Sequence, residues 1–224
     1  MTEQRPDPSY YPAFLDLRGK MAVVVGGGEV ALRKIEALLA VGAVVRVVAP
    51  EIHPDVEELE RRGVLRIERR SYRTGDLDGA ILVIAATSSS EVNRLVSEEA
   101  SRRNTLLNVV DAPALSGFIV PSVIRRGDLT VAISTGGLSP ALAKHIRRKL
   151  EESLVPEYGA FLRLLGDMRS RVRHELPLPE QREAFWSEVV NSDAFEIYRG
   201  SGDEAARGRI DEIMHRICGV EESN

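Results

Sequence analysis

The chain has 224 residues, of which 43% are hydrophobic and 29% charged, as is usual for a folded globular protein. These values exclude disorder throughout, and the longest apolar runs fall far below the roughly 18 residues that a membrane-spanning helix needs. The net charge of −4 gives no reason to expect nucleic acid as a partner.

The number of cysteines and the N-terminal residues indicate in which cellular compartment the protein is expected. Cys218 is the single cysteine, so no internal disulfide can form. Residues 1–12 are polar and rich in proline, without the apolar stretch of an export signal. We therefore expect a cytoplasmic protein with no membrane partner.

Strand and helix patterns alternate through the first half of the chain. Apolar runs at 21–25, 44–48, 81–85 and 106–110 predict strands, and a fifth strand is expected near 65–68. Helical patterns lie at 30–39, 55–62 and 91–102. This alternation is typical of a parallel sheet covered on both faces, which predicts an α/β fold.

The alternation stops after Asp111. Residues 117–125 and 129–134 resemble two strands of a hairpin, with Pro121 expected at an edge or a bulge. Ser139 and Pro140 have the residue types of an N-cap and a first helical position, which predicts a helix to about residue 150. Helical patterns then follow at 158–175, 180–190 and 204–217.

The segment from Gly26 to Ala31 has the spacing G-x-G-x-x-A between the first strand and the first helix. Gly26 allows the tight turn, Gly28 lets a pyrophosphate approach the backbone, and the small Ala31 lets helix and strand pack. The N–H groups at the start of the helix attract phosphate. The segment therefore predicts dinucleotide binding rather than a merely structural turn.

Glu51 follows the second strand, close to where an acidic residue commonly binds the adenosine ribose. Its alternative role is that of a negative charge near a helix N-terminus. Arg46 lies within the strand, and no arginine follows directly to favour a 2′-phosphate, so we expect NAD rather than NADP.

Two further polar residues follow strands at the same edge of the predicted sheet. Thr87 comes after the fourth strand and is expected to face the cofactor, or alternatively to cap the next helix. Asp111 comes after the fifth strand and is a candidate catalytic or binding carboxylate. Its alternative role is that of an Asx-turn residue before Pro113.

Other chemistries have little support in the sequence. The four histidines show no metal-ligand spacing, so no metal site is expected. Two basic clusters are each interpreted either as solvated faces or as sites for an anionic small molecule. The clusters comprise Arg61, Arg62, Arg66, Arg69, Arg70 and Arg73, and Arg125, Arg126, Lys144, His145, Arg147, Arg148 and Lys149.

Taken together, these segments resemble the precorrin-2 dehydrogenase and sirohydrochlorin ferrochelatase family, the N-terminal module of siroheme synthases. The resemblance is dense over about residues 10–155. Its matching segments are Tyr11–Leu17, Val25–Lys34, Ala85–Thr87, Asn108–Pro113, Phe118–Ser122 and Ser134–Ala143. The last two segments are more specific than the glycine loop, because generic dinucleotide-binding folds do not contain them.

The resemblance implies NAD-dependent oxidation of precorrin-2 to sirohydrochlorin, a step toward siroheme or cobalamin, with Fe²⁺ insertion as a further activity. It also implies a homodimer whose two copies build the active site. The domains expected are a Rossmann-like NAD-binding domain at 1–113, a central dimerisation hairpin segment at 114–153, and a small all-helical domain at 154–224. The methyltransferase region of siroheme synthases has no counterpart, so methylation is expected from another protein.

The resemblance also implies residue roles. Asp111 is expected to be the acid/base group. The expected cofactor contacts are Gly26, Gly28, Glu29, Val30, Pro50, Glu51 and Thr87. The expected contacts to the tetrapyrrole are Ser134, Thr135, Gly136, Lys144 and Arg148. Thr135 stands where some members have serine and retains the hydroxyl. The competing hypothesis is a regulatory module that binds NAD only as a sensor, which has no need of Asp111 beside a cationic hairpin.

Overall fold

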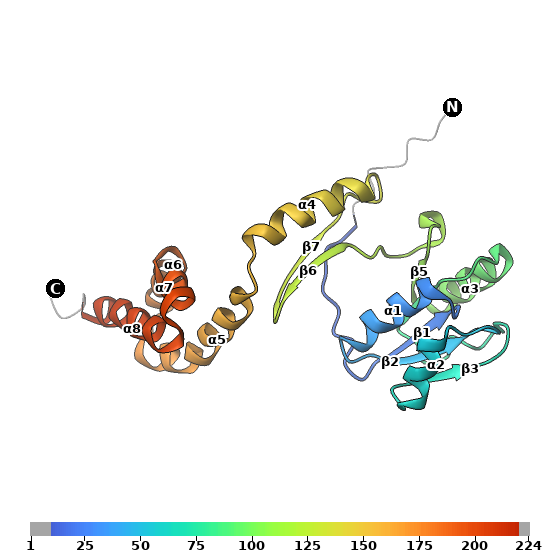
Figure 1. Ribbon diagram of the computed structural model, residues 1–224, viewed down its shortest axis with the longest axis horizontal. Coiled ribbons are helices and arrows are strands. Elements are labelled where there is room, and N and C mark those ends of the chain that lie inside the picture. Colours follow the sequence, from blue (N-terminus) through green and yellow to red (C-terminus); the bar gives the residue numbers. More distant parts are fainter. Residues whose placement is uncertain (1–9, 220–224) are drawn as a thin grey trace. The chain divides into compact units, whose positions relative to one another are not determined.

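The computed structural model describes residues 10–219, which form two compact units (Figure 1). One unit comprises the residues up to Val120 together with Gly136–Leu138, and the other comprises Pro121–Thr135 and the residues from Ser139 onward. Residues 1–9 and 220–224, at the ends of the first and last expected domains, lie outside the described part. The three-part division at residues 113 and 153 stays a prediction.

A five-stranded parallel sheet forms the centre of the first unit, in the order β3-β2-β1-β4-β5. Its strands are β1 (Met21–Val25), β2 (Val44–Val48), β3 (Leu65–Glu68), β4 (Leu82–Ala85) and β5 (Leu106–Val109). The strand order reverses between β1 and β4, the place where doubly wound sheets bind ligands beyond their carboxyl ends. The Rossmann-like fold predicted from the sequence is confirmed.

Both faces of this sheet are buried. Along β1, Ala22 and Val24 pack into the core that includes α1 (Glu29–Leu39) and α2 (Pro54–Arg61), while Val23 and Val25 pack into the core that includes α3 (Ser90–Arg103). Successive side chains of a strand point to opposite faces, so a strand buried on both sides must be apolar at every position. This requirement explains the unbroken apolar runs of β1 and β4.

A short connection leads from β5 to an antiparallel hairpin. It contains the 3-10 turn η1 (Pro113–Leu115), and the hairpin pairs β6 (Ser122–Arg126) with β7 (Leu129–Ile133). The predicted start of the first hairpin strand at Gly117 is wrong, because residues 117–121 are not strand and Pro121 precedes β6. Proline has no N–H to donate, and the strand begins only after it.

Helices complete the second unit. They are α4 (Pro140–Ser153), α5 (Glu157–Glu175), α6 (Pro179–Asn191), α7 (Ala194–Ser201) and α8 (Asp203–Gly219), of which α7 was not predicted. Ser139 caps α4 as expected, since its Oγ accepts a hydrogen bond from Leu142 N at 3.2 Å. Phe161, Leu164 and Phe185 are buried in the core that α5, α6, α7 and α8 share. None of the helices in residues 10–219 is long and apolar enough to cross a membrane.

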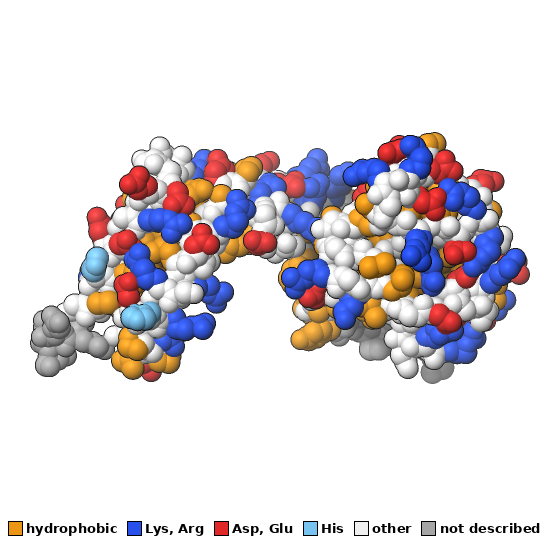
Figure 2. All heavy atoms as spheres, turned by 90° about the horizontal axis from the view of Figure 1, so that it is seen from below, with side chains coloured by type: hydrophobic (Ala, Val, Ile, Leu, Met, Phe, Trp, Pro, Cys, Tyr) orange, Lys and Arg blue, Asp and Glu red, His pale blue; other side chains and the backbone are white. Residues whose placement is uncertain are grey.

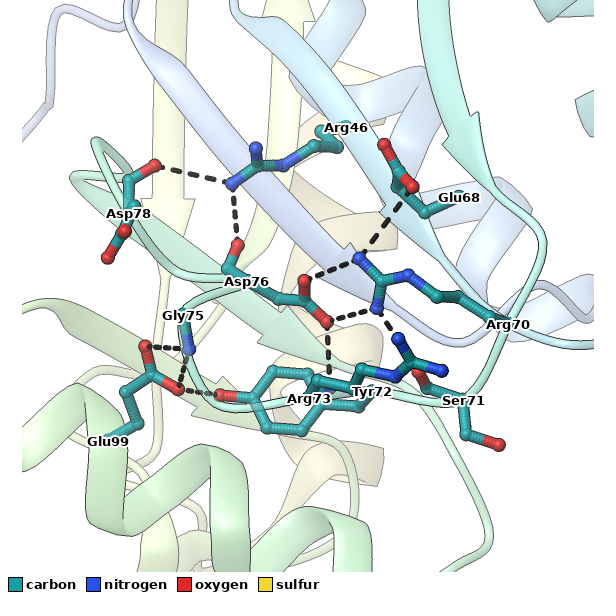
Figure 3. Close-up of polar contacts among 10 residues, drawn as sticks. All are labelled: Arg46, Glu68, Arg70, Ser71, Tyr72, Arg73, Gly75, Asp76, Asp78 and Glu99. Carbon is teal, nitrogen blue, oxygen red and sulfur yellow. Dashed lines mark hydrogen bonds and ion pairs between the residues drawn. The ribbon is translucent and has the colours of Figure 1, made fainter.

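The connection from β3 to β4 packs onto the sheet without a helix of its own (Figure 3). Its anchor is Glu99 of α3, whose side chain is almost wholly buried. The Glu99 carboxylate accepts hydrogen bonds from Tyr72 Oη at 2.5 Å, from Gly75 N at 3.0 Å and from Arg103 Nε at 2.7 Å. Burial opposes ionisation of Glu99, but these three donors together lower its pKa below the ordinary value of 4.5. The same contact raises the pKa of Tyr72, through desolvation first and the hydrogen bond second.

We expect Glu99→Gln to destabilise the chain by about 1–3 kcal/mol at pH 7, because the buried network loses its negative charge and one of its two acceptor oxygens, which an NH₂ donor replaces. Because the pKa of Glu99 is lower in the folded chain than in the unfolded chain, its ionised form stabilises the fold at pH values above the unfolded-state pKa. This stabilisation is lost as the pH falls through the folded-state pKa. The wild-type chain should therefore lose more stability than the variant between pH 6 and pH 3. Urea denaturation followed by circular dichroism measures both differences.

Glu98→Gln is the matched control, because Glu98 is exposed and, among residues 10–219, pairs only with Arg94 on the same helix. Exposed pairs of this kind contribute about 1 kcal/mol or less. Equal stabilities and equal pH dependence for Glu99→Gln and Glu98→Gln would show that the buried contact does not anchor the connection.

Candidate functional site

The loop between β1 and α1 contains three glycines with different surroundings. At Gly26, φ is +122° and an added Cβ would lie 2.2 Å from Ala86 O. At Gly27, an added Cβ would lie 2.2 Å from Glu51 O, a close approach that the motif alone did not reveal. At Gly28, φ is −83° and nothing lies within 4 Å of an added Cβ. Neither the backbone nor a neighbouring residue therefore requires glycine at position 28.

The glycine loop borders a cleft of about 540 Å³ at the carboxyl ends of β1, β2 and β4. The cleft is lined by residues 26–28, 49–53 and 86–88. The structure thus brings together five of the expected cofactor contacts, which are Gly26, Gly28, Pro50, Glu51 and Thr87. Glu29 and Val30 begin α1 and are exposed, but they are not among the lining residues.

The alternative role of Thr87 as a helix cap is wrong, while that of Glu51 as a charge near a helix N-terminus stays a prediction. Glu51 lies before α2, whose first-turn acids are Asp55 and Glu57. The N-cap of α3 is Ser89, and Thr87 Oγ1 accepts a hydrogen bond from Ser89 N at 3.2 Å. Both residues line the cleft.

Two residues at the cleft were not singled out from the sequence. His53 lines it and caps α2. Asn93 of α3 donates from Nδ2 to Thr87 O at 3.2 Å and so fixes the loop after β4. Neither belongs to a sequence motif, and the bond from His53 N to Gly27 O joins segments that are distant in the chain.

Asp111 lies one strand further along the same edge of the sheet. Val110 N donates to Ala85 O at 2.9 Å, which ties the segment before Asp111 to the end of β4. Asp111 has φ of +59°, is exposed, and makes no side-chain hydrogen bond with any residue of the 10–219 range. The alternative of an Asx turn is wrong for a simple reason. Such a turn needs the N–H of residue 113, which is proline.

Side chains on both flanks hold the segment that follows Asp111. Asn108 Nδ2 donates to Phe118 O at 3.0 Å, and Ser116 Oγ accepts from Val109 N at 2.9 Å. Gly117 N donates to Leu107 O at 2.7 Å. The chain therefore folds back along β5, which fixes the left-handed backbone at Asp111.

Lys34 of α1 is a further group near Asp111. It is partly buried, and burial is the largest cause that lowers its pKa, followed by the charge of Arg33, while the carboxylate of Asp111 raises it. Val110 and Phe118 pack against the same core as α1, which agrees with this proximity. A cation therefore lies in the electrostatic neighbourhood of the candidate acid/base group.

The expected tetrapyrrole contacts lie around the start of α4. Thr135 Oγ1 accepts a hydrogen bond from Ser139 N at 3.1 Å, while Lys144 and Arg148 are exposed and four residues apart on one helix, hence on a common face. Ser134 and Thr135 fall in the second unit, and Gly136 has φ of +63° and falls in the first. That these residues face Asp111 stays a prediction.

Three of the six arginines in the first basic cluster form ion pairs. Arg69 binds Glu60 at 2.7 Å, Arg70 binds Asp76 at 2.7 Å, and Arg61 pairs with Glu58. Figure 2 shows Lys and Arg mixed with Asp and Glu over the face in view. The interpretation as a solvated, ion-paired face therefore fits this cluster better than an anion site.

The fold and the glycine-lined cleft define a dinucleotide-binding protein of the Rossmann type. Comparison with known families adds three matches along the chain: a family described as putative NAD(P)-binding at residues 13–122, the central region of sirohaem biosynthesis proteins at 126–153, and the sirohaem synthase dimerisation region at 157–214.

Individual relatives agree with these matches. The chain is 41% identical over 203 residues to the siroheme synthase of Methylobacillus flagellatus and 43% identical over 205 residues to that of Pseudomonas fluorescens. In each case the match covers 91% of this chain and 44% of the relative, so the chain spans less than half the length of these siroheme synthases. The structure of SirC, a precorrin-2 dehydrogenase, matches with a TM-score of 0.75 and 28% identity, covering 91% of this chain and 100% of SirC. The chain belongs to the family of precorrin-2 dehydrogenases and siroheme synthases.

We expect Gly28→Val to fold normally and to lose NAD affinity by about tenfold or more, because its side chain enters the space that a pyrophosphate needs. Isothermal titration calorimetry measures the affinity, and thermal unfolding checks the fold. Gly27→Ala is the contrasting variant, since its Cβ would meet Glu51 O and should destabilise the fold itself. Unchanged NAD affinity in a folded Gly28→Val chain would contradict the assignment of this cleft as the pyrophosphate site.

Proposed function

We propose that the chain oxidises precorrin-2 to sirohydrochlorin with NAD as hydride acceptor, a step toward siroheme or cobalamin. The observation that carries this proposal is Asp111, an exposed carboxylate without a hydrogen bond to the described residues, beside a glycine-lined cleft. SirC, which matches over its whole length, is a precorrin-2 dehydrogenase. A regulatory module that only senses NAD has no use for such a carboxylate.

The residues of the cleft fit NAD. Gly28 leaves open the space that a pyrophosphate would occupy, at the start of α1, and Glu51 supplies an acceptor for a ribose hydroxyl. When bound there, NAD supplies the hydride acceptor. Glu29 and Val30, in the first turn of α1, are proposed as further contacts.

The charges around the cleft favour NAD over NADP. Arg46 donates to Asp76 O at 2.6 Å and to Asp78 O at 3.2 Å, so its guanidinium is engaged by the β3–β4 connection. Arg69 and Arg70, which follow β3 at the same edge of the sheet, are engaged by carboxylates. A 2′-phosphate would therefore find Glu51 nearby and these three arginines already occupied.

Oxidation of the tetrapyrrole removes one hydride and one proton. As the hydride leaves, positive charge develops on the substrate, which the carboxylate of Asp111 stabilises while it accepts the proton. Lys144 and Arg148 are proposed to bind carboxylates of the substrate, and Ser134, Thr135 and Gly136 to contact it. We also propose that Asp111 accepts the pyrrole protons released when Fe²⁺, as a substrate, enters sirohydrochlorin.

We expect Asp111→Asn to lower dehydrogenase turnover by about 100-fold or more, the usual scale for a positioned acid/base group. Asparagine tolerates the left-handed backbone of residue 111 as aspartate does, so the fold should persist. Affinity for NAD should remain close to that of the wild type. The absorbance of precorrin-2 and of NADH measures the oxidation. Absorbance after Fe²⁺ is added measures metal insertion, whose rate should fall together with the rate of oxidation.

The wild-type chain with precorrin-2 and NAD provides the reference. Binding of NAD without any oxidation of precorrin-2 would favour the sensor over the enzyme. Near-normal turnover in a folded Asp111→Asn chain would contradict the catalytic role of this residue while leaving the enzyme assignment in place.

We further propose that the chain is a homodimer. Phe161 and Leu164 of α5 give no support to this, because both are buried within the second unit itself. Support comes instead from the two-stranded hairpin, whose outer edges have no strand partner among the described residues, and from the exposed Leu142 and Leu150 of α4. An isolated hairpin is marginal in water, and unpaired edges invite further strands.

We expect sedimentation at micromolar concentration to show a dimer, and Leu142→Glu to shift it toward monomer by placing a charge in an apolar interface. Val64→Glu is the control, since Val64 is also exposed but lies in the sheet unit. A wild-type chain that sediments as a stable monomer would contradict the proposal.

A further inference from the structure

His53 lies in the cleft wall two residues after Glu51, and its side chain can exchange hydrogen bonds with a ligand. It lies between the end of β2 and the start of α2, and its backbone N donates to Gly27 O at 2.8 Å. This bond ties the position of His53 directly to the glycine loop. About a third of the side chain is exposed.

His53 Nδ1 accepts a hydrogen bond from Asp55 N at 3.2 Å and lies 3.7 Å from a carboxylate oxygen of Asp55. In the neutral ring that makes this hydrogen bond, the proton lies on Nε2. Nε2 has no hydrogen-bond partner among residues 10–219. One edge of the ring therefore caps α2, and the other retains an unused donor.

Glu51 offers the complementary group. Its side chain likewise makes no hydrogen bond with the residues that the structure describes, and it lies two positions before His53 in the same cleft wall. A vicinal diol has hydroxyls that both donate and accept. An unpaired carboxylate acceptor beside an unpaired N–H donor suits a ribose diol better than a phosphate.

We propose that His53 is a specificity-determining residue for the adenosine half of the dinucleotide, donating from Nε2 to a ribose hydroxyl while Glu51 accepts from the diol. This inference rests on the proposed function, because it assumes that the cleft binds NAD. It assigns His53 two separable tasks, a cap for α2 through Nδ1 and a contact to the ligand through Nε2.

His53→Asn separates the two tasks. The asparagine oxygen can replace Nδ1 as the helix cap, but no group of asparagine extends to the place of Nε2. We expect its melting temperature to stay close to that of the wild type. Its affinities for NAD and for ADP-ribose should each fall by about three- to tenfold, the effect of one neutral hydrogen bond. Both ligands should lose the same factor, because they share the adenosine half.

His215→Asn is the matched control, since His215 is an exposed histidine on α8 in the second unit. It should bind both ligands as the wild type does. Wild-type affinity in His53→Asn, or a loss for NAD without a loss for ADP-ribose, would overturn the assignment of His53.

A measurement on the wild-type chain tests the same contact without depending on whether a variant folds. In ¹⁵N spectra, the Nε2 resonance of His53 should shift when ADP-ribose is added, while Nδ1 stays unprotonated. An unchanged Nε2 resonance under saturating ADP-ribose would overturn the proposal. A wild-type chain that binds neither NAD nor ADP-ribose would instead contradict the proposed function itself, so the two failures are distinguishable.

Discussion

The close approach of the glycine loop to its two neighbouring strand ends is the constraint on which the site depends. Gly26 N donates to Val48 O, and Ala86 N donates to Val25 O, so the ends of β1, β2 and β4 are joined by backbone contacts. At Gly26 and Gly27 any Cβ would collide with a carbonyl oxygen of a neighbouring segment. Because those two glycines satisfy the packing, Gly28 is left with open space in front of it, and that space is the cleft.

Some charged side chains of the first unit are paired within the fold, and others near the cleft are not. Most arginines near the cleft edge are engaged by carboxylates or backbone carbonyls, and the buried Glu99 is satisfied by three donors. By contrast, the side chains of Glu51 and Asp111 make no hydrogen bond within the described residues. These two carboxylates therefore lie along one edge of the sheet, where a ligand can supply their partners.

The sheet and most helices could be predicted because their signals are local. Strands buried on both faces read as unbroken apolar runs, and Ser139 with Pro140 marks the start of α4. Helix α7 was missed because its eight residues are too few for a clear period. The close approach of Gly27 to Glu51 and the bond from His53 N to Gly27 O were missed because they join segments distant in sequence. The glycine loop, Glu51 and Thr87 could be predicted because each directly follows an apolar run whose end marks the end of a strand.

The conformation of Asp111 separates what the fold requires at this position from what chemistry requires. A left-handed backbone favours glycine, asparagine or aspartate, and asparagine would satisfy it as well as aspartate does. The flanking bonds of Asn108 and Ser116 hold the loop through other atoms, and Pro113 offers no N–H to the Asp111 carboxylate. The backbone geometry therefore accounts for a small polar residue but not for its negative charge. That charge acts on the partly buried Lys34 and, because Asp111 is exposed one strand along from the cleft, it is also available to a molecule that binds there.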